Sequence, residues 1–227
     1  MTARAFAIRP DPGLAATVEA GRALGISVTG HPLARVHPAA WNAPPDSAFD
    51  ALLLGSANAV RHAGPALSRW RGRAVHVVGE TTAEAARAAG LAVGMVGQGG
   101  LQQVVDALAD SGPARLLRLA GATHTVLAPP AGIAIDTRVV YHLAWREIAP
   151  DFAASLEEGG IVLLHSGEAA RHFAGECDRL GIARAPIALA ALAPRIAEAA
   201  GFGWRRVAVA PQPMDSALLA MVRDMCH

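Results

Sequence analysis

A short apolar segment that ends in small polar residues occurs twice, and it constrains the fold of this chain more than any other feature. The first copy is residues 51–54, followed by a Gly-Ser pair that ends at Ser56 and by residues that favour a helix. This pattern is typical of a buried strand, a tight turn and the first turn of a helix. The second copy is residues 160–164, followed by a His-Ser pair that ends at Ser166, an offset of 110 residues (166 − 56).

A second pair of segments repeats at nearly the same offset. Residues 77–83 lead through Gly79 into an alanine-rich helix, and residues 187–194 do the same through Ala190, an offset of 111 (190 − 79). Two features at one offset predict a chain made of two similar halves. Because strands alternate with helices along the chain, the predicted fold class is α/β, with parallel sheets covered on both faces.

Apolar runs, turn residues and helix boundaries predict the individual elements. Strands are expected at 5–8, 26–28, 51–54, 74–78, 91–96, 115–119, 133–145, 160–164, 187–190 and 207–210. Helices are expected at 14–24, 58–70, 101–109, 151–158, 169–180 and 194–200. A further helix is expected to begin at a cap at Thr81 or Thr82 and to end at Gly90, and a last helix to begin at 214 or 215. The stretch 31–45 carries four prolines and is interpreted as a connector.

Composition excludes several classes of function. The formal net charge of +1 gives no broad basic field, so nucleic acid is not an expected partner. No apolar run reaches the roughly 18 residues of a membrane span, and neither a signal peptide nor a membrane partner is expected. The 2 cysteines lie far apart in sequence, which favours reduced thiols and a cytoplasmic location. The sequence has no lysine, which rules out Schiff-base chemistry, a pyridoxal-phosphate site and a P-loop.

The sequence also lacks the familiar cofactor and metal patterns. Gly97-x-Gly99 has no third glycine of a dinucleotide fingerprint and is interpreted as a plain loop. The histidines show no H-E-x-x-H pairing, and no metal is expected even where His165 and His172 could share one helix face. Ser56 does not lie in G-x-S-x-G, so a nucleophile elbow is not expected.

Two predicted helix starts carry hydroxyl groups together with unpaired backbone N–H groups. One contains Ser56 and Asn58, and the other contains Thr81 and Thr82. Helix starts of this kind bind carboxylate or phosphate without a lysine, but simple N-capping explains the same residues without any ligand. Because the pattern recurs at several strand ends, we favour a site for a polyanion that is shared by two domains.

Two further residues are candidates for chemistry. Arg9 ends the first predicted strand, where its guanidinium can form paired hydrogen bonds with a carboxylate; the alternative is a surface or interdomain ion pair. Tyr141, the only tyrosine, can donate a hydrogen bond or a proton to a leaving group; the alternative is a half-buried aromatic residue whose hydroxyl faces water.

The order and spacing of these pieces resemble the uroporphyrinogen-III synthase family over essentially the whole chain. The matching segments are Arg9-Pro10, Pro32-Leu33, Phe49-Asp50 through Gly55-Ser56-Ala-Asn58-Ala-Val60, Val78-Gly79-Glu-Thr81-Thr82-Ala83 through Gly90, Val139-Val-Tyr141, Leu164-His-Ser166 through Phe173, Ala190 through Gly201, and Val207-Ala-Val-Ala210-x-x-Pro213. No single segment is diagnostic of the family.

The resemblance implies a specific architecture. It implies two similar flavodoxin-like α/β domains with parallel sheets, joined by a two-stranded linker. The first domain is then residues 1–34 plus 146–227, and the second is residues 38–138. The linker strands are expected at about 31–41 and 136–146, the second of which holds Tyr141.

The resemblance also implies a reaction and a set of site residues. Hydroxymethylbilane, a linear tetrapyrrole, closes to uroporphyrinogen III with inversion of its last ring and loss of water, and no cofactor is required. Tyr141 matches the tyrosine to which this family's proton-donor role is attributed. The implied substrate-binding residues are Arg9, Ser56, Asn58, Thr81, Thr82, Gly121, Ser166 and Gly167. The chain departs from the pattern at Ala193, where many members begin a helix with a hydroxyl residue.

One alternative from another functional class stays open at this stage. A two-domain module that closes on a small anion without catalysis would share the same helix starts. Under the enzymatic interpretation we expect a cytoplasmic monomer whose contact with hydroxymethylbilane synthase, the source of the substrate, is at most transient.

Overall fold

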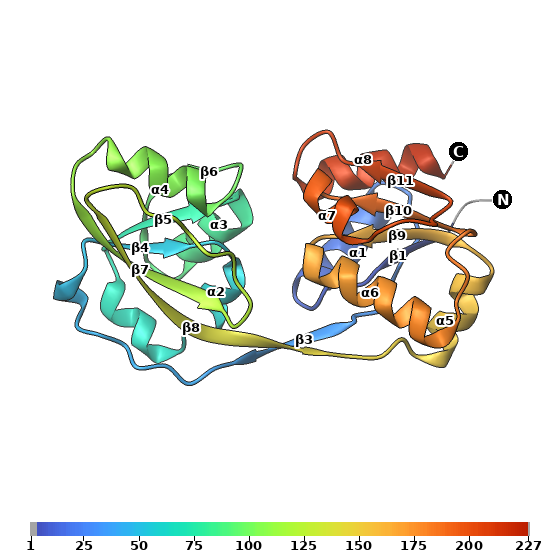
Figure 1. Ribbon diagram of the computed structural model, residues 1–227, viewed down its shortest axis with the longest axis horizontal. Helices are drawn as coiled ribbons and strands as arrows, with labels where there is room; N and C mark the ends of the chain where they lie inside the picture. The colour runs from blue at the N-terminus through green and yellow to red at the C-terminus, as the bar shows by residue number, and fades with distance from the viewer. Residues whose placement is uncertain (1–3, 227) are drawn as a thin grey trace. The chain divides into compact units, whose positions relative to one another are not determined.

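The computed structural model describes residues 4–226, and the chain forms two compact units. Unit 1 comprises the chain up to Arg35 and again from Ala144 onward, and unit 2 is Val36–Leu143. Each unit is built on one sheet with its own helices (Figure 1). Every strand pair whose register is resolved is parallel, which confirms the predicted α/β class.

Unit 1 contains a five-stranded sheet in the order β11-β10-β9-β1-β2. Its strands are β1 (Ala5–Ala7), β2 (Val28–Gly30), β9 (Gly160–Leu164), β10 (Ile187–Ala191) and β11 (Arg206–Val209). Its helices are α1 (Gly13–Ala23), α5 (Pro150–Glu157), α6 (Gly167–Leu180), α7 (Pro194–Ala199) and α8 (Asp215–Met225).

Unit 2 contains the second sheet, with six strands in the order β3-β8-β7-β4-β5-β6. Its strands are β3 (Ala34–Pro38), β4 (Ala51–Leu54), β5 (Ala74–Val78), β6 (Ala92–Gly97), β7 (Ala114–Gly121) and β8 (Ile133–Trp145), of which β3 and β8 run across the boundary of the unit. Its α-helices are α2 (Ala57–His62), α3 (Glu80–Ala88) and α4 (Leu101–Ala109), and two short 3₁₀ helices are η1 (Asp46–Ala48) and η2 (Pro65–Trp70).

The two sheets share one strand order, shifted along the chain. Numbered from β4, the five strands β4 to β8 of unit 2 lie in the order 3-2-1-4-5, with β3 added beside β8. Unit 1 has the same order when it is numbered from β9 through β11 and then β1 and β2. The repeat found in the sequence therefore aligns β4 with β9 and β5 with β10, which are neighbouring pairs in their sheets.

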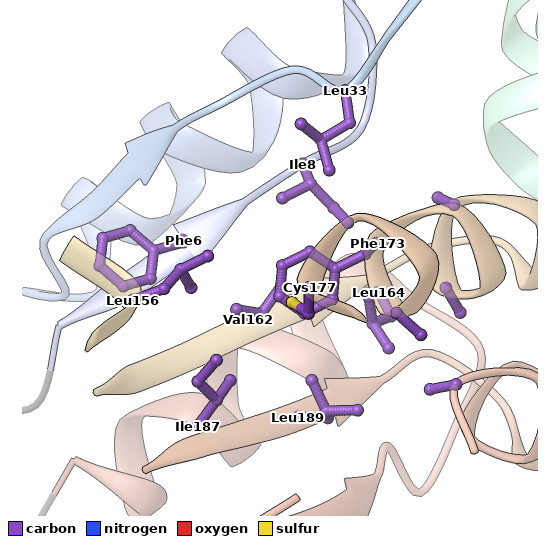
Figure 2. Close-up of a cluster of buried hydrophobic side chains, with 14 of the residues drawn as sticks. Phe6, Ile8, Leu33, Leu156, Val162, Leu164, Phe173, Cys177, Ile187 and Leu189 are labelled. Carbon is purple, nitrogen blue, oxygen red and sulfur yellow. The ribbon is translucent and has the colours of Figure 1, made fainter. Parts of the chain in front are cut away.

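The core of unit 1 has two layers because side chains alternate along its buried strands. Phe6 and Leu164 face α5, α6 and α7, whereas Ala7 and Leu163 face α1 and α8. Figure 2 shows the first layer, in which Phe173 and Cys177 of α6 lie among side chains from the strands. Burial raises the pKa of the Cys177 thiol to about 12, so this cysteine is a packing residue and not a nucleophile.

Two of the differences between the predicted and observed elements have a clear local reason. The predicted helix 58–70 is α2 followed by η2, because Gly64 has φ of +69° and Pro65 supplies no backbone N–H. The strand expected at 26–28 begins at Val28, because the N–H of Ile26 bonds to the carbonyl of Gly21 and closes α1. The connection 122–132 between β7 and β8 contains no helix. Across residues 4–226, no helix combines the length and the hydropathy that crossing a membrane requires.

The packing around Phe173 generates a stability prediction. Phe173 is fully buried, whereas Phe202 in the connection before β11 is 94% exposed. We expect Phe173→Ala to lower the free energy of unfolding by about 3–5 kcal/mol because it leaves a cavity in the core. The matched change Phe202→Ala should alter it by less than about 0.5 kcal/mol. Urea titration of both variants measures the difference, and equal losses would contradict this assignment of the core.

Candidate functional site

In each sheet the carboxyl ends of the parallel strands lie at the same edge. Between two neighbouring strands of each sheet the direction in which the chain adds strands reverses. The reversal lies between β4 and β7 in unit 2 and between β9 and β1 in unit 1. Open α/β sheets bind ligands at such a point. In unit 2, Ser56 follows β4 and Gly121 ends β7; in unit 1, Arg9 follows β1 and Ser166 follows β9. Within each unit, the structure thus brings predicted residues to the favoured edge.

Ser56 is the N-cap of α2. Its hydroxyl oxygen accepts a hydrogen bond from the backbone N–H of Asn58 at 3.2 Å. The amide oxygen of Asn58 in turn accepts a bond from Arg61 Nη1 at 3.4 Å. Both side chains are partly exposed, so Ser56 can still donate its hydroxyl hydrogen to a ligand. The capping of α2 is sufficient to explain a serine at position 56, and a contact between Ser56 and a ligand would be a second role.

Tyr141 lies directly over Gly121. A Cβ atom built on Gly121 would come within 2.7 Å of the Tyr141 ring and within 3.0 Å of its hydroxyl, so only glycine leaves room for this contact. The backbone N–H of Ala122 bonds to the carbonyl of Tyr141 at 2.9 Å. Tyr141 and Gly121, which were predicted as separate site residues, are therefore in contact at the carboxyl end of β7.

A β-bulge aims the Tyr141 side chain. The register between β7 and β8 shifts at Ala120/Gly121, where Ala120 pairs with Val139 and Gly121 pairs with Tyr141. Val140 and Tyr141 both pack against the cluster beneath α2 and α3, which a regular strand would not allow for adjacent residues. Bulges redirect side chains in this way next to functional sites.

Histidines lie near the tyrosine in the same unit. The ring of His62, in the last turn of α2, lies 6.3 Å from the ring of Tyr141 between centroids. Burial lowers the pKa of His62, and the charges of Arg61 and His37 lower it further, so the imidazole is neutral at neutral pH. His37 and His142 stack on each other at 5.5 Å. Among residues 4–226, no three histidine, cysteine or acidic side chains gather to hold a metal ion.

The predicted cap at Thr81 or Thr82 is wrong. The N-cap of α3 is Gly79, with φ of +77°, and no side chain caps the helix. Thr81 and Thr82 lie inside its first turn, because the positive φ of Gly79 lets the chain enter the helix earlier than a threonine cap would. Thr81 is exposed, whereas Thr82 is only 5% exposed, so its side chain belongs largely to the packing of α3.

Arg9 is part of a hydrogen-bonded cluster in unit 1 and is not an isolated cation. Arg9 Nη1 lies 3.0 Å from Asp215 Oδ2 and 3.3 Å from Thr17 Oγ1. The hydroxyl of Thr17 donates to Asp215 Oδ2 at 2.8 Å, and His165 Nε2 lies 2.8 Å from Asp215 Oδ1. The ion pair that the sequence left as an alternative for Arg9 is present, and it lies within one unit.

The protonation states of this cluster follow from its burial. Burial lowers the pKa of His165, although Asp215 partly opposes the shift, so the imidazole is neutral at neutral pH. Burial alone would raise the pKa of Asp215, but the bond from His165 and the charge of Arg9 outweigh it and hold the pKa well below its usual value. Because an ionised Asp215 only accepts, we assign the imidazole hydrogen to Nε2 of His165.

Ser166 and Gly167 begin α6. The hydroxyl oxygen of Ser166 accepts a bond from the N–H of Ala169 at 3.2 Å, so Ser166 caps this helix as Ser56 caps α2. Gly167 is the first helical residue, and a Cβ there would make ordinary contacts, the shortest of them with Ala199 at 3.4 Å. At the start of α7, Ala193 is an N-cap without a side-chain hydrogen bond and Pro194 is the first helical residue.

Sequence reasoning missed Asp215 and Thr17 and weighed His165 only as a metal ligand. The sequence showed Asp215 as the start of the last helix, but its partner Arg9 lies 206 positions away. No local pattern encodes such a pairing. The one usable signal was the recurrence of the strand-turn-helix unit, which places His165 at a strand end equivalent to Gly55.

Comparison with known proteins bears on the sequence and the fold of this chain. The family model described as Uroporphyrinogen-III synthase HemD matches residues 15–220. A search of curated protein sequences found no match. Among solved structures, the chain is similar to uroporphyrinogen-III synthetase from Helicobacter pylori 26695, with a TM-score of 0.64 and 16% identity over 99% of this chain and 100% of that chain.

The chain is also similar to a mutant uroporphyrinogen III synthase from the extremely thermophilic bacterium Thermus thermophilus. That match has a TM-score of 0.51 and 14% identity, and it covers 98% of each chain. At these identities the two structures support the fold, whereas the family model rests on the sequence and covers most of it. The chain therefore belongs to the uroporphyrinogen-III synthase family.

Proposed function

We propose that the chain converts hydroxymethylbilane, a linear tetrapyrrole, to uroporphyrinogen III, closing the macrocycle with inversion of the last pyrrole ring and loss of water. The single observation that carries this proposal is the family match over residues 15–220. The contact of Tyr141 with Gly121 supports it, because a phenol at the ligand-binding edge of a sheet suits a reaction that needs an acid for its leaving group.

The substrate carries eight carboxylates, and the predicted binding residues suit acidic groups. Ser166 and Gly167 begin the 14-residue helix α6, whose N-terminal dipole attracts an anion. Ser56 and Asn58 supply a hydroxyl and an amide at the end of β4. Of the two threonines we assign the contact to the exposed Thr81 rather than to the buried Thr82.

Arg9 contributes a guanidinium that its neighbours hold in place. Asp215 and Thr17 both bond to it, so little side-chain freedom remains to be lost when a carboxylate arrives. The same pairing reduces the net charge at this point. We therefore assign Arg9 the role of orienting one carboxylate, and not that of supplying most of the affinity.

Tyr141 donates the proton that the leaving hydroxyl group requires. The hydroxymethyl group lies on the first ring, at the opposite end of the chain from the ring that inverts. The pyrrole nitrogen of this first ring releases electron density as the carbon–oxygen bond breaks, the phenol protonates the departing hydroxide, and water and a cationic azafulvene result. After the inverted ring has attacked and the macrocycle has closed, the phenolate recovers a proton from the ring that formed the new bond. The protein thereby directs closure before the spontaneous route to the unrearranged isomer.

We also propose that the chain acts as a cytoplasmic monomer and receives hydroxymethylbilane through transient contact with hydroxymethylbilane synthase. Spontaneous closure of the substrate favours such a transfer. Neither Cys177 nor Cys226 is in a disulfide, which suits a reducing compartment.

Separation of the product isomers tests the function. The purified chain is mixed with hydroxymethylbilane synthase and its substrate, and the products are oxidised and resolved by chromatography. We expect predominantly the type III isomer, and predominantly type I when the chain is omitted. Only type I in both reactions would refute the proposal and leave the anion-binding module as the alternative.

Removal of the Tyr141 hydroxyl tests the proton-donor role. We expect Tyr141→Phe to lower kcat at least about tenfold with little change in KM, because the ring still packs over Gly121 while the acid is lost. Turnover in the isomer assay measures the effect, and binding of the oxidised product, uroporphyrin III, checks that the site is intact. Unchanged kcat would rule out this role for Tyr141.

Gly121→Ala tests the same geometry without touching the tyrosine. The new Cβ would collide with the Tyr141 ring and displace it, so kcat should fall by about as much as in Tyr141→Phe. The matched control is Gly175→Ala in α6, where a Cβ meets nothing within 4 Å and turnover should stay at the wild-type level. If Gly121→Ala keeps full activity while folded, the contact does not position Tyr141 for catalysis.

A further inference from the structure

Arg118 is a buried cation in the middle of β7. Its exposed fraction is 5%, and it pairs in the sheet with Leu53 of β4 and Thr137 of β8. Because paired residues of parallel strands point to the same face, Arg118 shares a face with Leu53, which packs under α4. Its guanidinium therefore leaves the strand on the apolar side that α4 covers.

No carboxylate neutralises this guanidinium within residues 4–226. Arg118 appears in no ion pair, and its Nη1 donates to the carbonyl oxygen of Thr125 at 2.8 Å. Its Nε is buried and has no hydrogen-bond partner. Burial lowers the pKa of Arg118, and the attraction of Tyr141 partly opposes this shift. An arginine nevertheless stays charged in proteins, so the site holds an uncompensated positive charge.

An unpaired buried charge and an unsatisfied buried donor both cost stability. Unit 1 shows the ordinary solution, in which Asp215 accepts bonds from Arg9, Thr17 and His165. Arg118 has no such carboxylate, so an anionic ligand is needed to neutralise its charge. A buried charge without a partner lowers stability, and such destabilising features are expected at functional sites.

The position of Arg118 suits a ligand at the edge of the sheet. The three residues that follow it lead to Gly121, beneath Tyr141, and its bond partner Thr125 is an exposed residue of the helix-free connection 122–132. This connection is fastened to α4, because Gln102 bonds to both the N–H and the carbonyl of Ala128 at 2.9 Å. The guanidinium therefore reaches the exposed connection that follows the carboxyl end of β7.

We propose that Arg118 binds one carboxylate of the tetrapyrrole substrate, and that the carbonyl of Thr125 holds the guanidinium until the ligand arrives. The identity of the ligand rests on the proposed function, whereas the need for an anion follows from the unpaired charge. The carboxylate accepts hydrogen bonds from Nε and from a second guanidinium nitrogen, which satisfies the buried donor and neutralises the charge. Arg118 is thereby a specificity residue for one acidic side chain of the substrate.

Binding of uroporphyrin III, an eight-carboxylate porphyrin, tests this assignment by fluorescence titration without any turnover. We expect Arg118→Met to raise Kd at least about tenfold with Tm unchanged or raised, since the variant removes an unpaired buried charge. Arg118→Lys keeps the cation but loses the paired hydrogen bonds, so its Kd should rise clearly less than that of Arg118→Met. The matched control is Arg115→Met at the exposed amino end of β7, with Kd unchanged.

The outcomes separate this proposal from the proposed function. Wild-type affinity in Arg118→Met overturns the role of Arg118, even if the chain makes the type III isomer. Equal weakening in Arg118→Met and Arg118→Lys overturns it too, because the charge is then irrelevant. A fall in Tm with unchanged Kd identifies a loop clamp and also overturns it. If the wild type makes only the type I isomer, the proposed function fails while the titrations still decide whether Arg118 binds an anion.

Discussion

In each sheet a central strand pairs in parallel with two neighbours, and this pairing determines where the candidate functional residues lie. β4 pairs with β5 and β7, and β9 pairs with β10 and β1. Because all these strands run the same way, their carboxyl ends meet at one edge, and the connections diverge there. Small residues at that edge let helix starts and side chains approach each other. Gly121 shows this most clearly, because the side chain of any larger residue would displace Tyr141.

The two units differ in how an arginine at the equivalent strands β1 and β7 is paired. In unit 1, Asp215 balances Arg9 and accepts bonds from His165 and Thr17, so that cluster is neutralised within the protein. In unit 2, Arg118 lies among apolar side chains with a single carbonyl contact. The positive charge is therefore balanced within the protein in unit 1, whereas no carboxylate of the described residues balances it in unit 2.

Local patterns predicted most of the elements but not the details of the site. The strand at Ala51–Leu54 and the helix start at Ser56 follow from residues that are adjacent in sequence, and the structure has both. The prediction of a cap at Thr81 or Thr82 was wrong because Gly79, with a positive φ, is the N-cap of α3. The sequence did not show this, because glycine adopts positive and negative φ equally readily. The bulge before Tyr141 has no sequence signature, because it depends on the register of β7 against β8.

The sequence by itself determined the α/β class, the repeat of strand-turn-helix units and the family to which the chain belongs. These properties depend on short-range periodicity and on the order of segments, which a linear chain displays directly. Only the tertiary structure decided that Arg9 pairs with Asp215, that Gly121 leaves space for Tyr141 and that Arg118 is buried without a counter-ion among the described residues. Such contacts join residues from separate strands and helices, and packing alone determines which of them meet.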